Sequence, residues 1–179
     1  MGESEKTTNN GVLSTCFEWV SILIGALIAV VVVFTFLFRV VGVSGDSMCN
    51  TLMDRDRLVL ITRFYTVERG DIVVLYREGA EPYVKRIVAV EGDTIDIDDE
   101  SGRVLLNGET LLEEYVRDGV TPSHGFDGPY TVGKGEIFVM GDNRLWSLDS
   151  RQLGVFTVNE IVGEAVFRLF PFESFGSIK

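Results

Sequence analysis

Tyr83-Val84-Lys85-Arg86-Ile87-Val88-Ala89-Val90 is a run of mainly β-branched and aromatic residues that stops at Gly92-Asp93. A short apolar run bounded by turn residues predicts a buried β-strand. Similar runs occur along the rest of the chain, and they lack the length and periodicity of a long helix. The other expected strands are residues 57–61, 72–76, 94–97, 103–106, 136–140 and 165–169. Many short strands with almost no helix predict an all-β domain.

The segments between these strands carry turn and cap signals. Asn107-Gly108 suits a type I′ hairpin turn, because both residues tolerate positive φ. Residues 116–130 are rich in glycine and proline and predict a long loop. Thr157-Val158-Asn159-Glu160 has the spacing of a capping box, which predicts a short helix that ends near Gly163. The last strand is expected to end at Pro171.

An uncharged apolar segment, residues 19–38, precedes the β-rich part of the chain. It is about 20 residues long, roughly 30 Å as a helix, which is enough to cross a bilayer. The alternative is a cleaved signal peptide, which requires a basic start and small residues at the cleavage site. Here the segment ends in Phe36-Leu37-Phe38-Arg39. An uncleaved transmembrane helix is therefore predicted, with Trp19 as an interfacial aromatic residue.

This helix divides the rest of the chain into two parts. Residues 1–15 are polar and predict a disordered tail. Residues 39–179, about 140 residues, suffice for one domain with a substantial core. The expected organisation is a short tail (1–18), a transmembrane helix (19–38) and one β-rich domain (39–179).

Composition argues against several kinds of partner. The formal net charge is −11, and a nucleic-acid partner is not expected because phosphate binding needs a basic surface. Cys16 and Cys49 lie on opposite sides of the apolar segment and cannot pair within one chain. Since no Cys/His spacing suits zinc, we expect no metal, no cofactor and no disulfide framework.

Gly45-Asp46-Ser47-Met48 follows the apolar segment closely. From Arg39 to Ser47 the chain spans at most roughly 28 Å, which keeps Ser47 near a membrane surface. A serine becomes a nucleophile only when a base takes its proton and donors stabilise the oxyanion. Gly45 allows a close backbone approach, and Ser47 is the candidate nucleophile. The alternative, a turn or capping serine, is the commoner role for an isolated Gly-x-Ser.

Two residues could act as the base. Lys85 lies inside an apolar strand, where alternation places it on one face with Tyr83, Ile87 and Ala89. Desolvation there lowers the pKa of a lysine towards neutrality, which a general base needs; the alternative is a lysine whose head group reaches water. His124 is the single histidine, and it lies in the predicted loop, where histidines are usually solvated.

A third stretch, Gly141-Asp142-Asn143-Arg144-Leu145-Trp146-Ser147-Leu148-Asp149-Ser150-Arg151, follows a predicted strand. Ser147 or Ser150 could fix the amine of Lys85. Charged residues of this stretch and of the lysine strand could pair and keep the loop rigid: Arg86, Asp142, Arg144, Asp149 and Arg151. A solvated loop with surface ion pairs is the alternative. The density of compatible polar groups favours Lys85 as a base.

Together these stretches resemble the bacterial type I signal peptidases (leader peptidases), which are membrane-anchored serine proteases with a Ser–Lys dyad. The resemblance runs from the apolar segment to Pro171. Four blocks carry it in order and spacing: Gly45-Asp46-Ser47-Met48 with Thr51-Leu52, Arg69-Gly70-Asp71-Ile72-Val73, Tyr83-Val84-Lys85-Arg86-Ile87-Val88 with Gly92-Asp93, and the stretch from Gly141 to Arg151. Glycine two residues before the serine is similar to the Gram-positive branch. The implied fold is a mostly antiparallel, coiled or barrel-like β-sheet.

The resemblance implies roles for individual residues. Ser47 attacks the scissile carbonyl, and Lys85 acts as general base and later as general acid. The backbone N–H of Ser47 contributes to the oxyanion hole, whereas a serine hydroxyl that some relatives add is replaced here by Gly45. The implied supporting residues are Ser147, which hydrogen-bonds the Lys85 amine, Asp149 with Arg151, which hold the loop, and Asp142, which pairs with Arg86.

A substrate pocket is implied as well. Such pockets select the Ala-x-Ala-like ends of signal peptides, bound as an added β-strand. The matching positions are Val43, Met48, Leu52, Tyr83 and Val84 around the P1 side chain, with Val41 and Leu58 nearer P3. Gly45 is also expected to bind the substrate.

Two residues depart from the family pattern. Asn50 stands where the family usually has proline, which removes the fixed φ that stiffens a turn. Trp146 stands where relatives commonly carry a polar residue. Neither change removes a reacting group, so altered turn rigidity or local packing is expected rather than an inactive enzyme.

The resulting hypothesis is a hydrolase that removes signal peptides during protein secretion. It is expected in the plasma membrane as a single-pass protein, with the N-terminus in the cytoplasm and the catalytic domain on the outer face. The resemblance gives this orientation, because Lys6 and Arg39 do not decide it by charge. Its expected partners are signal peptides of preproteins and the lipid bilayer. The alternatives are an anchored β-domain that only binds extended peptides and a self-cleaving, repressor-like Ser–Lys protease.

Overall fold

The computed structural model describes residues 3–178, and the chain forms two compact units, Met1–Phe38 and Arg39–Lys179. The first unit is one helix, α1 (Glu3–Leu37). Its part from Thr15 to Leu37 has a mean hydropathy of 3.0 and is long and apolar enough to cross a membrane. Apolar side chains such as Phe17, Leu23 and Phe36 are exposed along it, as they are on a helix that faces lipid.

The prediction of a disordered tail over residues 1–15 is wrong for the part that is described, because α1 begins at Glu3. Helix propagation is easier than nucleation. Residues 3–15 contain no proline to stop a helix that the apolar segment has already nucleated. The helix therefore extends backwards into a polar sequence that has little amphipathic pattern of its own.

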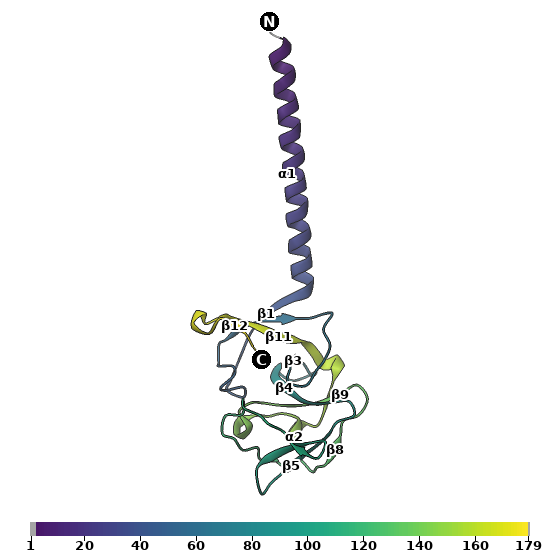
Figure 1. Cartoon of the computed structure of the whole chain (residues 1–179), viewed down its shortest axis with the longest axis vertical. Coiled ribbons are helices and arrows are strands. Elements are labelled where there is room, and N and C mark those ends of the chain that lie inside the picture. Colours follow the sequence, from purple (N-terminus) through teal and green to yellow (C-terminus); the bar gives the residue numbers. More distant parts are fainter. Residues whose placement is uncertain (1–2, 179) are drawn as a thin grey trace. The chain divides into compact units, whose positions relative to one another are not determined.

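The second unit is built on an eight-stranded sheet with the order β1-β2-β11-β3-β4-β9-β10, to which β12 is added beside β11 (Figure 1). Every pair of its strands with a described register is antiparallel. This agrees with the predicted fold class, an all-β domain of mostly antiparallel strands in a curled sheet. The strands are β1 (Phe38–Gly42), β2 (Arg57–Ile61), β3 (Ile72–Leu75), β4 (Tyr83–Val90), β9 (Glu136–Met140), β10 (Phe156–Thr157), β11 (Ile161–Phe170) and β12 (Gly176–Ser177).

A smaller sheet has the order β7-β6-β5-β8. Its strands are β5 (Thr94–Asp98), β6 (Arg103–Leu106), β7 (Glu109–Thr110) and β8 (Tyr130–Thr131). Asn107 and Gly108 have φ values of 55° and 84°, as a type I′ turn requires. The predicted hairpin is confirmed, since Leu106 pairs with Glu109 across this turn.

Helical structure in the second unit is limited to short pieces: η1 (Arg144–Trp146), α2 (Ser150–Leu153), η2 (Val158–Glu160) and η3 (Phe172–Ser174). Thr157 and Glu160 form the predicted capping box, but the helix stops after a single turn. The predicted end near Gly163 is wrong, because β11 runs through this residue. A Cβ atom on Gly163 would lie 2.8 Å from the Ile61 carbonyl oxygen, so glycine is needed for the close approach of β2.

The strand that carries Lys85 lies in the middle of the large sheet. β4 is paired with β3 on one side, where Lys85 faces Val73, and with β9 on the other. A register shift between Ile87 and Ala89 interrupts the alternation. As a result Ile87 packs in one core cluster and Ala89 in another, so the expected single face from Tyr83 to Ala89 does not extend past this shift.

Candidate active site

Ser47 lies in a tight turn between β1 and β2. The Cys49 N–H donates to the Asp46 carbonyl over 3.1 Å, and the Leu52 N–H donates to the Met48 carbonyl over 2.8 Å. Gly45 enters the turn with φ +86°, a conformation that side chains disfavour. Met48 and Leu52 are buried in the core beneath the turn. The backbone thus holds Ser47 half-buried above a packed apolar base.

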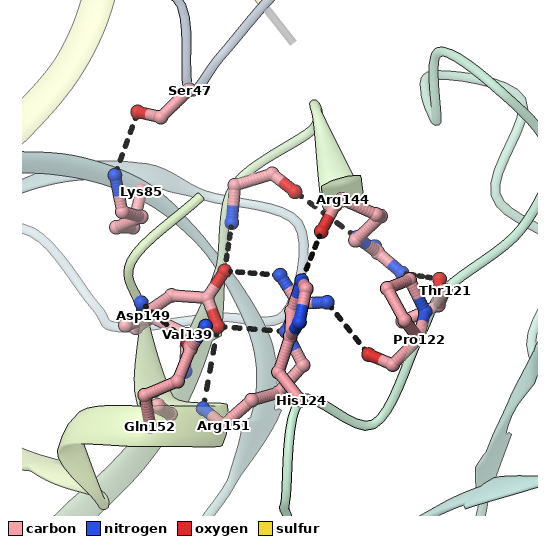
Figure 2. Close-up of polar contacts among 12 residues, drawn as sticks. Ser47, Lys85, Thr121, Pro122, His124, Val139, Arg144, Asp149, Arg151 and Gln152 are labelled. Carbon is pink, nitrogen blue, oxygen red and sulfur yellow. Dashed lines mark hydrogen bonds and ion pairs between the residues drawn. The ribbon is translucent and has the colours of Figure 1, made fainter. Parts of the chain in front are cut away.

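The side chain of Lys85 points at this serine (Figure 2). Its Nζ donates hydrogen bonds to Ser47 Oγ over 2.7 Å and to the Val84 carbonyl oxygen over 3.0 Å. Lys85 is only 3% exposed, and this burial lowers its pKa from 10.5 to about 8, although the nearby charges of Asp149 and Asp142 oppose the change. A substantial fraction of the amine is therefore neutral in mildly alkaline solution, and a neutral amine within 2.7 Å of the Ser47 hydroxyl can accept its proton.

A buried asparagine, Asn143, holds the backbone of the serine turn. The Asn143 N–H donates to the Ser47 carbonyl over 3.0 Å, and Asn143 Nδ2 donates to the Asp46 carbonyl over 3.0 Å. Both bonds come from the loop that follows β9. They join the serine turn to that loop through main-chain atoms, which positions Ser47 without using its hydroxyl.

Gly141 lets the loop and the turn approach each other. A Cβ atom on Gly141 would lie 2.3 Å from Ser147 Oγ and 2.4 Å from the Ser47 carbonyl oxygen. No side chain fits in this space. Glycine at the start of the loop is therefore required by packing.

The expected hydrogen bond from Ser147 to the Lys85 amine is absent, and that prediction is wrong for this structure. Ser147 is 3% exposed, and its Oγ has no hydrogen-bond partner among the described residues. The lysine amine is directed instead at Ser47 Oγ and its own strand's carbonyl. The Ser147 hydroxyl packs over Gly141 rather than binding Lys85. Ser150, the other candidate, accepts a hydrogen bond from the Val139 N–H.

Asp149 and Arg151 form a buried pair next to the lysine (Figure 2). Arg151 donates to both carboxylate oxygens over 2.8 Å, and Asp149 also accepts the Gly141 N–H over 3.0 Å. Burial raises the pKa of the Asp149 carboxyl, but the hydrogen bonds and charge of Arg151 outweigh it and lower the pKa overall. Asp149 also caps α2, so this ionised carboxylate organises the whole loop around Gly141.

Asp142 and Arg86 form a second buried pair, as the sequence predicted. Arg86 donates to the two Asp142 oxygens over 2.9 and 2.7 Å and to the Gly70 carbonyl over 2.8 Å. Thr51 Oγ1 donates to the same carboxylate. The pair therefore connects β4, the segment before β3 and the end of the serine turn.

Arg144 supports the site through partners that the sequence does not indicate. The sequence predicts only that Arg144 forms an ion pair. It is buried, forms an ion pair with Glu113, and donates to Thr121 Oγ1 and to the Gly141 carbonyl. His124 makes a 3.2 Å hydrogen bond with the Arg144 carbonyl oxygen, so the histidine belongs to this support. Glu113 and Thr121 lie in the connection before β8, where no periodic pattern marks them.

A groove of two connected cavities passes over Ser47. One cavity, of about 290 Å³, is lined by residues 43–48 and 82–85 with Trp146 and Leu148. The other, of about 560 Å³, is lined by Val41, Gly42, Ser44, Val74, Tyr76, Glu81, Pro82, Val84 and Val162. Ser44, Pro82 and Val84 belong to both, so the two cavities adjoin along these two chain segments.

Six of the eight residues expected around the substrate line this groove: Val41, Val43, Gly45, Met48, Tyr83 and Val84. Leu52 and Leu58 do not, because both are 0% exposed in the core cluster beneath the groove. Matching a family position does not reveal how deep a side chain lies. These two leucines can shape the groove only through the side chains above them. Among the described residues, no group of three or more histidine, cysteine or acidic side chains could hold a metal ion.

Comparisons with known proteins show the family to which the chain belongs. The chain matches the family "Signal peptidase, peptidase S26" over residues 16–170. A signal peptidase I of Bacillus amyloliquefaciens is 37% identical over 99% of this chain and 98% of its own length. The chain belongs to the signal peptidase I family. Another relative, signal peptidase I P of Bacillus subtilis subsp. natto, is 39% identical over 89% of this chain and 92% of its own. A solved structure of a signal peptidase I from Enterococcus faecalis covers 57% of this chain and 98% of its own, at 25% identity and a TM-score of 0.46.

Membership of the signal peptidase I family confirms the resemblance that the four sequence blocks carry. The protein is an enzyme, a serine-type peptidase and hydrolase. Both departures from the family pattern lie at the surface of the site. Asn50 is exposed in the serine turn, and Trp146 is 78% exposed and lines the groove beside Ser47.

Proposed function

We propose that this protein removes signal peptides from translocated preproteins by cleaving after Ala-x-Ala-like sites, with Ser47 as nucleophile and Lys85 as general base. One observation carries the proposal: the 2.7 Å hydrogen bond between Lys85 Nζ and Ser47 Oγ. It supports the proposal because a base must lie within hydrogen-bond reach of the proton it takes and have a pKa near the working pH. Lys85 has both properties.

The reaction proceeds through an ester intermediate. Neutral Lys85 takes the proton of Ser47 Oγ as this oxygen bonds to the scissile carbonyl carbon. The Ser47 N–H stabilises the negative oxygen that forms. The Lys85 ammonium then gives its proton to the leaving amine when the C–N bond breaks. A water molecule, deprotonated by the same lysine, attacks the ester carbon. The lysine ammonium then gives this proton to Ser47 Oγ as the ester C–O bond breaks, and the signal peptide leaves with a free carboxyl end.

The substrate binds in extended form between the two segments that line the groove. Residues 41–44 form one wall and residues 81–84 the other. An extended peptide can add to such walls as a further β-strand, with alternate side chains directed into pockets. The P1 side chain lies in the smaller cavity beside Ser47, and P3 lies in the larger one near Val41.

The helix α1 supplies the membrane anchor. Its apolar part ends at Leu37, ten residues before Ser47, and that length of chain reaches at most roughly 35 Å. The nucleophile therefore acts close to the bilayer, where translocated signal peptides are held. In this proposal residues 1–18 are the cytoplasmic tail, 19–38 cross the plasma membrane once, and 39–179 act on its outer face. The partners are signal peptides and bilayer lipid.

Cleavage assays with single variants test the dyad. The full-length protein in detergent is mixed with a preprotein whose signal peptide has the sequence Ala-x-Ala at its C-terminal end. We expect cleavage by the wild type and by Lys134→Ala, which replaces an exposed lysine outside the groove. Ser47→Ala and Lys85→Ala should each lose at least about a thousandfold in kcat. Equal activity of all four proteins contradicts the assignment, and no cleavage by wild type contradicts the proposed substrate.

A further inference from the structure

Trp146 exposes apolar surface next to the reacting groups. It is 78% exposed, and Leu148 on the same loop is 50% exposed. Both line the cavity that contains Ser47 and Lys85. Apolar surface of this size left in water costs free energy at about 25 cal/mol per Å², and an exposed apolar patch beside polar reacting groups is typical of a binding site.

The loop that carries these side chains is firmly held. Asn143, Arg144 and Ser147 are all buried, and the Trp146 N–H donates to the Asn143 carbonyl over 3.1 Å. Arg144, immediately before Leu145, is fixed by its ion pair with Glu113. The backbone on both sides of Trp146 is therefore rigid. The indole of Trp146 therefore lines the groove because the rigid backbone holds it there, and not because the loop is disordered.

The order of residues along the groove places Trp146 relative to the scissile bond. The two walls of the groove are the segments from Val41 to Ser47 and from Glu81 to Lys85. In each wall the residue number rises towards the reacting side chain, Ser47 or Lys85. Trp146 and Leu148 line only the cavity at the Ser47 end. On the proposed function, P3 occupies the other cavity, and P1 is the one residue before the scissile bond whose side chain enters the cavity at the Ser47 end. The part of the groove beside Trp146 is then left for the residues that follow the scissile bond.

We infer that Trp146 and Leu148 form an apolar subsite for one of the first two side chains of the mature protein. Consecutive side chains of an extended peptide point to opposite faces, so only one of these two positions contacts the indole. The subsite gives this enzyme a preference for a large apolar or aromatic residue at that position. The inference rests on the proposed function and concerns the selectivity of the same site.

Cleavage of matched substrates tests the preference. The substrates are preproteins that differ only in carrying Leu or Asn at the first or the second residue after the cleavage site. The kcat/KM of the full-length enzyme is measured for each. The wild type should prefer Leu by about tenfold at one of the two positions. Trp146→Asn should abolish that ratio by slowing only the Leu substrate, and Trp146→Phe should retain most of it. Phe64→Asn, which replaces another exposed aromatic residue outside the groove, should leave the ratio unchanged.

Three results overturn the inference. The first is a Trp146→Asn enzyme that retains the wild-type ratio, the second is one that slows all substrates equally, and the third is one whose preference changes at a position before the scissile bond. Any of these would show that the indole does not contact the mature end of the substrate.

A binding measurement separates this inference from the proposed chemistry. Trp19 and Trp146 are the two tryptophans of the chain, so Trp19→Phe leaves Trp146 as the single indole fluorophore. In the Ser47→Ala background, the Leu peptide should shift the Trp146 emission to shorter wavelength at lower concentration than the Asn peptide. The inference is overturned if both peptides shift the Trp146 emission at the same concentration. It is also overturned if the emission in micelles is already at shorter wavelength and does not change when peptide is added. Failure of the proposed function appears differently, as the absence of Ser47-dependent cleavage of every substrate.

Discussion

A Cβ atom on Gly141 would lie 2.4 Å from the carbonyl oxygen of Ser47. This close approach lets the loop after β9 donate the Asn143 N–H to the same carbonyl oxygen. The position of the candidate nucleophile therefore depends on the absence of a side chain 94 residues away in sequence (141 − 47).

Gly141→Ala is the first prediction. The added methyl group must displace backbone at Ser47 or the side chain of Ser147, so we expect a loss of about 1–3 kcal/mol in the free energy of unfolding. Activity should fall by at least about a hundredfold, because a shift of about 1 Å is enough for that. Thermal unfolding and a cleavage assay measure the two effects. Gly133→Ala is the control, since the atoms nearest to its Cβ would be the carboxylate end of the Glu136 side chain and not backbone; equal effects of both variants contradict the packing argument.

The buried pair of Arg86 and Asp142 gives a second prediction. Arg86→Met leaves the Asp142 carboxylate in the core without its partner, which should cost about 3–5 kcal/mol of stability. Arg55→Met breaks a pair with Asp54 whose arginine side chain is 91% exposed, and it should change stability by no more than about 1 kcal/mol. Denaturation of both variants under one set of conditions compares them. A difference within error would mean that the Asp142 site is far less desolvated than its burial indicates.

Lys85→Met is the third prediction, and it couples stability to pH. The folded pKa of Lys85 is about 8, compared with 10.5 in the unfolded chain. Below pH 8 both states bind the proton, and folding carries the cost of burying the ammonium, about 3 kcal/mol. Between pH 8 and 10.5 the unfolded state binds more protons, so wild-type stability rises with pH.

The methionine variant should therefore be more stable than wild type at pH 7, inactive, and free of this rise between pH 8 and 10.5. Unfolding of both proteins by denaturant at several pH values measures these stabilities. A variant that is less stable than wild type by the same amount at every pH would show that Lys85 stabilises the fold.

Ser147→Ala is the fourth prediction. Because Ser147 Oγ is buried without a hydrogen-bond partner, its removal should leave stability within about 1 kcal/mol of wild type or raise it slightly. Thermal unfolding measures this change. A larger loss would mean that the hydroxyl is hydrogen-bonded in solution, as the family resemblance implies.

Several strands could be predicted to the residue. β2, β4 and β9 coincide with apolar runs bounded by turn residues, because both signals depend on local sequence alone. The two-residue strands β10 and β12 were not predicted, since short edge segments contain no periodic pattern. The register shift beside Val88 was also missed, because a bulge is decided by the neighbouring strand and not by the residues of β4.

The site was also predictable in part, where single residues are unusual for their local sequence. Ser47 and Lys85 stand out because a glycine-flanked serine and a lysine in an apolar strand are locally unusual. The ion pair of Arg144 with Glu113 joins residues 31 positions apart across irregular chain, and no sequence pattern indicates it. Leu58 was expected in the substrate pocket because its position matches the family, but only the packed structure shows that other side chains cover it.

The pH dependence of kcat/KM tests the central claim, that Lys85 is the base for Ser47. Wild-type activity should rise with pH along a single limb with an apparent pKa of about 8 and then level off, because only the neutral amine accepts the serine proton. The limb should be unchanged in His124→Ala. A limb near pH 6.5, the ordinary pKa of histidine, that disappears in His124→Ala would contradict the account.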